Sequence, residues 1–151
     1  MQARKSIAMR QQYHFRPSER GLIAWDVNRL LRLTKDLPRF HVELTAIREL
    51  DEPYWFSAGP GDATCRAVLE HARLIEEADL SFPIILSSDG RVMDGMHRVA
   101  KAALKGFTSI EAVQFKCDPD PDFIGLGPDE LPYDAKNPES SADTTSSKSG
   151  S

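Results

Sequence analysis

The sequence contains few cysteines, and they lie far apart. Cys65 and Cys117 are its only two thiols, and their spacing fits no metal-binding motif. Small proteins that depend on a disulfide framework contain more cysteines than this. We therefore expect a reduced, cytoplasmic protein.

Long apolar segments are also absent. No stretch approaches the roughly 18 apolar residues of a membrane-spanning helix. The basic residues Arg4, Lys5 and Arg10 are not followed by the apolar segment of a signal peptide. We expect no association with a membrane. At 151 residues, the chain fits one domain with a hydrophobic core.

The net charge of −4 is unevenly distributed along the chain. Residues 1–40 carry a net charge of +6, residues 41–117 carry −4, and residues 118–151 carry −6. The basic N-terminal arm could bind the acidic tail of the same chain, or a DNA or protein partner. The mixed charge of the middle segment does not favour a dedicated nucleic-acid-binding protein.

We divide the chain into five predicted segments. Residues 1–16 are a basic mobile arm, 17–40 hold an N-terminal helix, 41–117 form the main domain, 118–136 are an acidic Pro-rich extension, and 137–151 are a disordered polar tail. The helix is predicted from a start signal at residues 17–19 and from apolar residues at helical spacing: Leu22, Ile23, Val27, Leu30 and Leu31.

Three elements are predicted in the main domain outside its central motif. Residues 41–47 and 109–115 alternate as strands. A helix capped by Asp62 or Thr64 runs to about Ala78, and its predicted core face consists of Cys65, Val68, Leu69, Ala72 and Ile75. Between the first strand and this helix, Tyr54, Trp55 and Phe56 are either largely buried or line a ligand pocket.

The most informative segment covers residues 82–107. A short apolar strand at 84–86 is followed by Asp89-Gly90, a pair typical of a type I′ turn, and by a returning strand at 91–94. Gly95 then allows a sharp turn into a helix that ends near Gly106. This pattern predicts a hairpin, a glycine corner and a helix.

The start of this helix is a candidate anion site. Its predicted apolar face is Met96, Val99, Ala100, Ala103 and Leu104. His97 and Arg98 place cations at the positive end of the helix dipole, which is unfavourable. A bound anion would make the interaction there favourable. First-turn amides and Arg98 would cradle a phosphate, and Arg66, in the first turn of the preceding helix, could face the same anion. Alternatively, Arg98 simply pairs with Asp94.

The residues DGMHRVAKAALKG, from 94 to 106, resemble the signature box of the ParB/sulfiredoxin-like superfamily, which appears as GERR in partition proteins, GCHR in sulfiredoxins and DGHHR in free-serine kinases. Residues 43–122 are also similar to small bacterial ParB-like proteins through YWF, ATCRAV, PIILSSDGRVMDGMHRVAKA and AVQF. The resemblance implies an α/β (α+β) domain, a small mixed sheet with flanking helices.

The resemblance also implies a function for residues 94–98. It assigns Gly95, Met96, His97 and Arg98 to the phosphates of ATP, ADP or CTP, with Mg²⁺ as a companion ion, and it makes Asp94 and His97 candidate catalytic residues. Met96 stands where sulfiredoxins have their cysteine, so sulfiredoxin chemistry is not expected. Met96 also replaces the acidic residue of GERR, which puts cytidine-nucleotide switching in doubt.

Four functions are consistent with these observations. They are a phosphotransferase acting on a nucleotide or another phosphorylated small molecule, a non-enzymatic nucleotide sensor, a DNA-associated accessory protein, and a nuclease. The nuclease is the least favoured, because the sequence lacks a cluster of metal-binding carboxylates. A metal site formed by Asp94 and His97 alone would have too few ligands, and we predict none.

Overall fold

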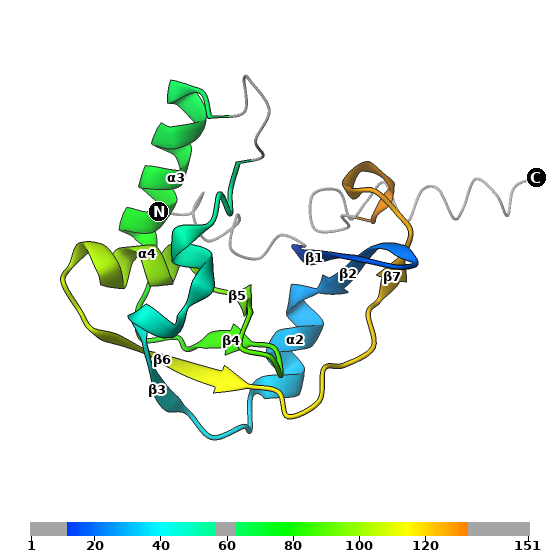
Figure 1. Ribbon diagram of the computed structural model, residues 1–151, viewed down its shortest axis with the longest axis horizontal. Helices are drawn as coiled ribbons and strands as arrows, with labels where there is room; N and C mark the ends of the chain where they lie inside the picture. The colour runs from blue at the N-terminus through cyan, green and yellow to red at the C-terminus, as the bar shows by residue number, and fades with distance from the viewer. Residues whose placement is uncertain (1–11, 57–62, 133–151) are drawn as a thin grey trace, which may run out of the picture. The chain divides into compact units, whose positions relative to one another are not determined.

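The structure is a computed structural model that describes residues 12–56 and 63–132. These residues fall into two compact units: unit 1 combines 12–32 with 120–132, and unit 2 consists of 33–56 and 63–119. Both contain small sheets, which together with the helices confirm the predicted mixed α and β class (Figure 1). No helix in the described part of the chain is long and apolar enough to cross a bilayer. Most of the predicted arm and the whole predicted tail lie outside the described residues.

Unit 1 is built on a three-stranded antiparallel sheet in the order β1-β2-β7. Its strands are β1 (Tyr13–Ser18), β2 (Gly21–Asp26) and β7 (Phe123–Ile124), and the helix α2 (Val27–Thr34) follows β2. A short 3₁₀ helix, η3 (Pro128–Glu130), precedes the buried Leu131. Trp25 in β2 and Leu30 in α2 are also buried.

The prediction of one helix over residues 17–40 is wrong. Residues 13–26 form a hairpin, and the helix begins only at Val27. Leu22 and Ile23 fit a helical spacing, but they also continue into Trp25 as a strand that pairs with the aromatic segment of β1. Pro17 is tolerated because β1 is an edge strand of its sheet.

Unit 2 is built on a four-stranded mixed sheet in the order β3-β6-β4-β5. The strands are β3 (Phe40–Glu43), β4 (Ile84–Leu86), β5 (Val92–Asp94) and β6 (Ser109–Gln114). β4 runs parallel to β6, and the other neighbours are antiparallel. The predicted strands at 84–86 and 109–115 are therefore confirmed, the second as β6.

The predicted strand over residues 41–47 ends early, at Glu43. The chain continues as two 3₁₀ helices, η1 (Leu44–Ala46) and η2 (Arg48–Asp51). Leu44 and Ile47 are both buried, although they are three residues apart. A strand would point them to opposite faces of the sheet, whereas a tight helical turn brings both onto the core.

The turn between β4 and β5 differs from the predicted type I′ turn, which needs positive φ at both central residues. Only Gly90 has a positive φ, of 89°. The Gly90 amide donates to the Ser87 carbonyl at 2.9 Å, and the Ser87 hydroxyl bonds the Asp89 carboxylate. The fully buried Ser87 thus has its polar groups satisfied within the turn.

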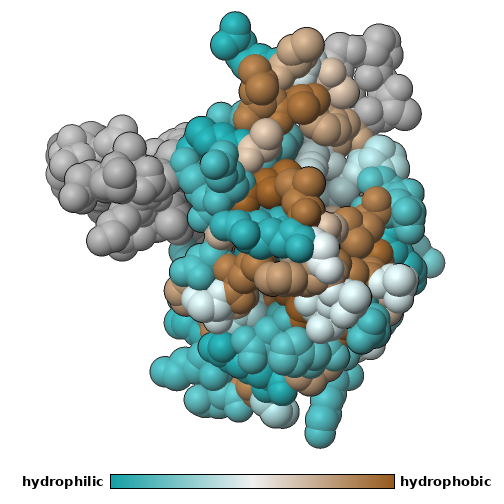
Figure 2. Space-filling view, turned by 90° about the vertical axis from the view of Figure 1, so that its left-hand side faces the viewer, coloured by the Kyte–Doolittle hydropathy of each residue, from teal (hydrophilic) through white to brown (hydrophobic). Residues whose placement is uncertain are grey.

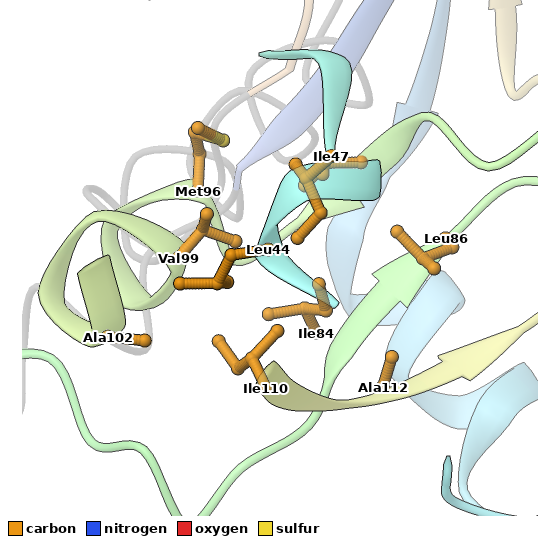
Figure 3. Packing of buried hydrophobic residues seen from close by; sticks show 10 residues of the cluster. Leu44, Ile47, Ile84, Leu86, Met96, Val99, Ala102, Ile110 and Ala112 are labelled. Atoms are coloured by element: carbon orange, nitrogen blue, oxygen red, sulfur yellow. The ribbon is translucent and has the colours of Figure 1, made fainter. Parts of the chain in front are cut away.

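The helix α4 (Met96–Leu104) lies between β5 and β6 in the chain and closes the core of unit 2. Its buried residues are Met96, Val99 and Ala102, which pack with Ile84 of β4, Ile110 of β6 and the 3₁₀ helices (Figure 3). The predicted apolar face is therefore rotated: Leu104 is 77% exposed. Gly106, with a φ of 82°, ends α4, and the next amide, of Phe107, bonds Ala102.

A longer helix, α3 (Cys65–Glu77), contacts α4 (Figure 1). The predicted cap is confirmed, because the Thr64 hydroxyl accepts from the Ala67 amide at 3.1 Å. The predicted core face is wrong. No residue of α3 is fully buried, and its half-covered apolar positions are Ala67, Leu74 and Ile75.

Candidate functional site

The Gly95 corner, which we define as residues 94–98, joins β5 to α4. Gly95 adopts a left-handed conformation with a φ of 111°. A β-carbon there would lie 2.7 Å from Ile84 Cγ2 and 2.8 Å from an Arg98 Nη2 atom. The glycine predicted at this corner is therefore required twice, once for its backbone angle and once for space.

Arg98 is held inside the corner by Asp94. Its Nη2 atom donates to Asp94 Oδ2 at 2.8 Å, and the two side chains are only 15% and 18% exposed. Burial raises the pKa of Asp94, while Arg98 acts in the opposite direction. The simple pairing left open by the sequence is thus present. It uses one of the several donors of the guanidinium group.

The first-turn amides of α4 are available as donors. The Val99 amide donates to the Gly95 carbonyl and begins the helical ladder. The amides of Met96, His97 and Arg98 precede that ladder and have no acceptor within the described residues. These groups lie at the positive end of the helix dipole, which favours an anion.

His97 in the first turn of α4 forms a hydrogen bond with His71 of α3. The distance between His71 Nδ1 and His97 Nε2 is 2.9 Å. The ring planes differ by 22° and the centroids are 5.1 Å apart, so the two rings meet edge to edge. We call these residues the histidine pair.

Trp55 supports the histidine pair. Its indole ring stacks on His71 and on His97 with centroid distances of 4.6 Å in both cases. The two imidazole rings lie on the same face of the indole, because they are closer to each other than opposite faces would allow. Phe56 meets His71 edge-on at 5.4 Å. Two of the three adjacent aromatic residues therefore position histidines.

Burial keeps both histidines neutral near pH 7. Desolvation, followed by the charges of His71 and Arg98, lowers the pKa of His97 from 6.5 to about 4. Desolvation also lowers the pKa of His71, against a smaller opposing effect of Glu70. The lowered pKa shows that desolvation of His97 outweighs the preference of the Trp55 face for a cation, which acts in the opposite direction.

A neutral pair of this kind has opposite functions at its two ends. One proton lies between His71 Nδ1 and His97 Nε2, which leaves one outer nitrogen as an acceptor and the other as a donor. When the acceptor end takes up a proton, the shared proton moves to the other ring and the donor end releases its own proton, so the two ends exchange functions. The pair can therefore accept a proton at one end and release another at the other end.

The other residues considered for this site have different surroundings. The Met96 side chain is buried in the core (Figure 3), so only its amide remains available to a ligand. Arg66 is exposed in the first turn of α3 and has no ion pair with other described residues, whereas Arg98 is paired with Asp94. Glu70, the neighbour of His71 in α3, pairs with Arg73 at 2.5 Å.

His71 is the main residue of the cluster that the sequence did not identify. Its partner His97 is 26 residues away on another helix. The available signal was the spacing of His71 with Ala67, Leu74 and Ile75, which marks the side of α3 that contacts α4. In the described part of the chain, no three His, Cys, Asp or Glu side chains are arranged to hold a metal ion.

Comparisons of the whole chain with models of known protein families, with characterised proteins and with solved structures found no match.

Proposed function

We propose that unit 2 binds a phosphorylated small molecule, a nucleotide such as ATP, ADP or CTP, at the Gly95 corner, and that the histidine pair transfers a proton there. The observation that carries this proposal is the histidine pair itself. It joins a neutral acid–base unit to the first turn of α4, beside amides without acceptors. The resemblance of residues 94–98 to the box of the ParB/sulfiredoxin-like superfamily implies the same ligand, and we include that fold in the proposal.

The proposed binding mode uses backbone amides more than charged side chains. Phosphate oxygens accept from the first-turn amides, where the helix dipole favours negative charge. Asp94 orients Arg98, and the remaining guanidinium donors would bond the phosphate in this scheme. Asp94 is therefore a positioning residue in this scheme, and His97 is the catalytic one. The described donors form no metal cluster, so Mg²⁺ would enter with the nucleotide as part of the substrate.

Phosphoryl transfer would follow from this arrangement. The outer acceptor nitrogen of the histidine pair takes the proton of an acceptor hydroxyl group. The hydroxyl oxygen forms a bond to the terminal phosphorus while the bond from that phosphorus to the bridging oxygen breaks. The nucleoside diphosphate leaves, and the proton departs through the opposite end of the pair.

Thermal unfolding with nucleotides, with and without Mg²⁺, tests the binding step. A ligand at about a hundred times its dissociation constant adds roughly 2.7 kcal/mol, and the midpoint should rise by about 5–20 °C. The double variant Asp94→Asn/Arg98→Gln keeps a hydrogen bond but removes both charges, and it should lose most of this shift. The variant Lys105→Ala, with an exposed cation at the far end of α4, should keep it. If neither nucleotides nor phosphate stabilise the wild-type protein, the proposal is wrong.

Phosphorus NMR of Mg²⁺–ATP separates an enzyme from a sensor. An enzyme converts the nucleotide, and His97→Asn should slow that conversion by about 10²-fold or more while nucleotide binding remains. Binding without conversion in the wild-type protein would instead support the sensor. A DNA-associated function predicts a steep loss of DNA binding with added salt.

A further inference from the structure

The apolar surface of α3 has two parts, and α4 covers only one of them. The inner part includes Ala67, His71, Leu74 and Ile75, all half-covered. The outer part, which we call the outer stripe, consists of Cys65, Val68, Leu69 and Ala72 and is exposed. Leu69 is 68% exposed and Val68 is 48% exposed. Figure 2 shows apolar side chains gathered over α3, at the top of that view.

Packing within unit 2 does not account for the apolar outer stripe. Residues at positions i, i+3, i+4 and i+7 lie along one side of a helix, and this spacing is typical of a helix that packs on another element. All four residues of the outer stripe are exposed, so no described element of unit 2 covers this side of α3. Contiguous exposed apolar groups on a helix commonly mark an interaction site.

The outer stripe is complementary to the outer stripe of a second copy when the two helices run antiparallel. Its two large residues, Val68 and Leu69, lie at the centre, and the small residues Cys65 and Ala72 lie at the ends. An antiparallel pair therefore brings Val68 onto Leu69 of the other copy and Cys65 onto Ala72. Small residues at both ends allow the helices to approach closely, at about 8–10 Å between axes.

The charges of α3 favour the same orientation. Arg66 lies near the positive N-terminal end of the helix, and Glu76, one turn beyond Ala72, lies near the negative C-terminal end. A parallel pair would place like charges and like dipole ends together. An antiparallel pair places Glu76 of each copy beside the helix start of the other.

We infer that the outer stripe is a homodimer interface at which α3 packs antiparallel against α3 of a second copy of this chain. The interface is isologous, with the two-fold axis passing between Val68 and Leu69. It does not involve the side of α3 that carries His71. The inference is therefore independent of the proposed function.

The oligomeric state of the full chain tests this inference by sedimentation velocity. The wild-type protein should sediment as a dimer at about 0.1 mM, and Leu69→Glu should weaken the dimer by roughly tenfold or more. The control Leu104→Glu places the same charge at the 77% exposed position on α4 and should leave the dimer intact. Circular dichroism melts establish that both variants fold. A monomeric wild-type protein, or dissociation by the control alone, would overturn the inference.

Cross-linking tests the antiparallel orientation separately, in a background with Cys117→Ser. Two copies of Cys65 would lie about seven residues, roughly 10 Å, apart along the helix and should not form a disulfide. The variant Ala72→Cys places a new thiol opposite Cys65 of the other copy and should give a covalent dimer that a reductant separates. Ala103→Cys, exposed on α4, should give none. Rapid oxidation through Cys65 alone would indicate a parallel pair and contradict this arrangement.

Discussion

Gly95 determines the geometry of the proposed site at the scale of single residues. Its left-handed backbone lets β5 end and α4 begin within one residue, so that His97 and Arg98 both fall in the first turn. The absence of a side chain also makes room for the Arg98 guanidinium. The Arg98 guanidinium can therefore bond Asp94 while lying against the backbone of the corner.

Replacing Gly95 by alanine should destabilise the protein by about 2–5 kcal/mol. The left-handed conformation costs an L-residue about 1–2 kcal/mol, and the contact with Ile84 adds about 1–3 kcal/mol of overpacking. Gly106→Ala is the matched control, because Gly106 also has a positive φ, of 82°, but open space around it. Urea unfolding of both variants separates the two effects. Equal losses would show that the space at Gly95 is not restricted.

The lowered pKa of His97 makes stability depend on pH. The folded protein releases its proton at about pH 4, whereas the unfolded chain binds one near pH 6.5. Between these values the unfolded state holds more protons, so the free energy of unfolding should fall by about 1–3 kcal/mol from pH 7 to pH 4.

The His97→Asn variant should lose this part of the pH dependence, and His41→Asn, at an exposed position on β3, should keep it. The raised pKa of Asp94 changes stability with pH in the opposite direction. Both variants retain Asp94, so this contribution is reduced when they are compared. Urea titrations at several pH values measure the slope. An unchanged slope in His97→Asn would show that His97 is not neutral in the folded protein.

At the scale of elements, α3 and α4 are joined by polar contacts as well as by the histidine pair. Lys101 Nζ donates to the carbonyls of Glu76 and Ala78, at 2.9 and 2.6 Å. These carbonyls belong to the C-terminal end of α3, where a cation also complements the helix dipole. Lys101 therefore anchors the helix that carries His71 against the helix that carries His97.

Replacing Lys101 by methionine should cost about 1–3 kcal/mol, because the charged hydrogen bonds are lost while most of the aliphatic chain is kept. Lys105→Met, one turn further along α4 and exposed, should change stability by less than about 0.5 kcal/mol. Thermal unfolding of the two variants provides the comparison. Similar losses in both would contradict the anchoring role of Lys101.

Elements with strong local signals were predictable from the sequence. The apolar run at residues 84–86, the alternation of residues 109–115 and the glycines at 95 and 106 mark β4, β6 and the ends of α4, and the structure confirms them. The same signals identified Asp94, Gly95, His97 and Arg98 as neighbours. Local spacing did not reveal which side of α3 contacts α4. Distant residues decide that contact. The pairing of β1 with β2 is local, and it was missed because Leu22 and Ile23 also fit a helical spacing.

The covering of the edge strand β5 in unit 2 could likewise not be predicted from the local sequence. Glu49 is only 2% exposed, and its carboxylate accepts from the Val92 amide at 2.7 Å, which covers part of the edge strand β5. Nothing near Glu49 in the sequence predicts this bond across 43 residues. Arg91 adds an ion pair with Glu49 at 3.4 Å and another with Glu52 at 2.7 Å.

For the whole molecule, unit 2 contains both the Gly95 corner and the outer stripe of α3. The proposed site and the proposed dimer interface lie on different sides of α3 and are therefore expected to act independently. Mutations in the outer stripe should change the oligomeric state without changing nucleotide binding. Mutations in the histidine pair should slow nucleotide conversion without changing the oligomeric state.

Nitrogen NMR of the imidazole rings at pH 7, with and without Mg²⁺–ATP, tests the central claim most directly. The chain has four histidines. His41 lies on β3, at the edge of the unit 2 sheet opposite β5, and serves as an internal control. We predict neutral rings for His71 and His97 that share one proton, and nitrogen shifts that change in both rings when ATP binds while those of His41 do not. A protonated ring in either residue, or nitrogen shifts in the pair that ATP leaves unchanged, would contradict the account.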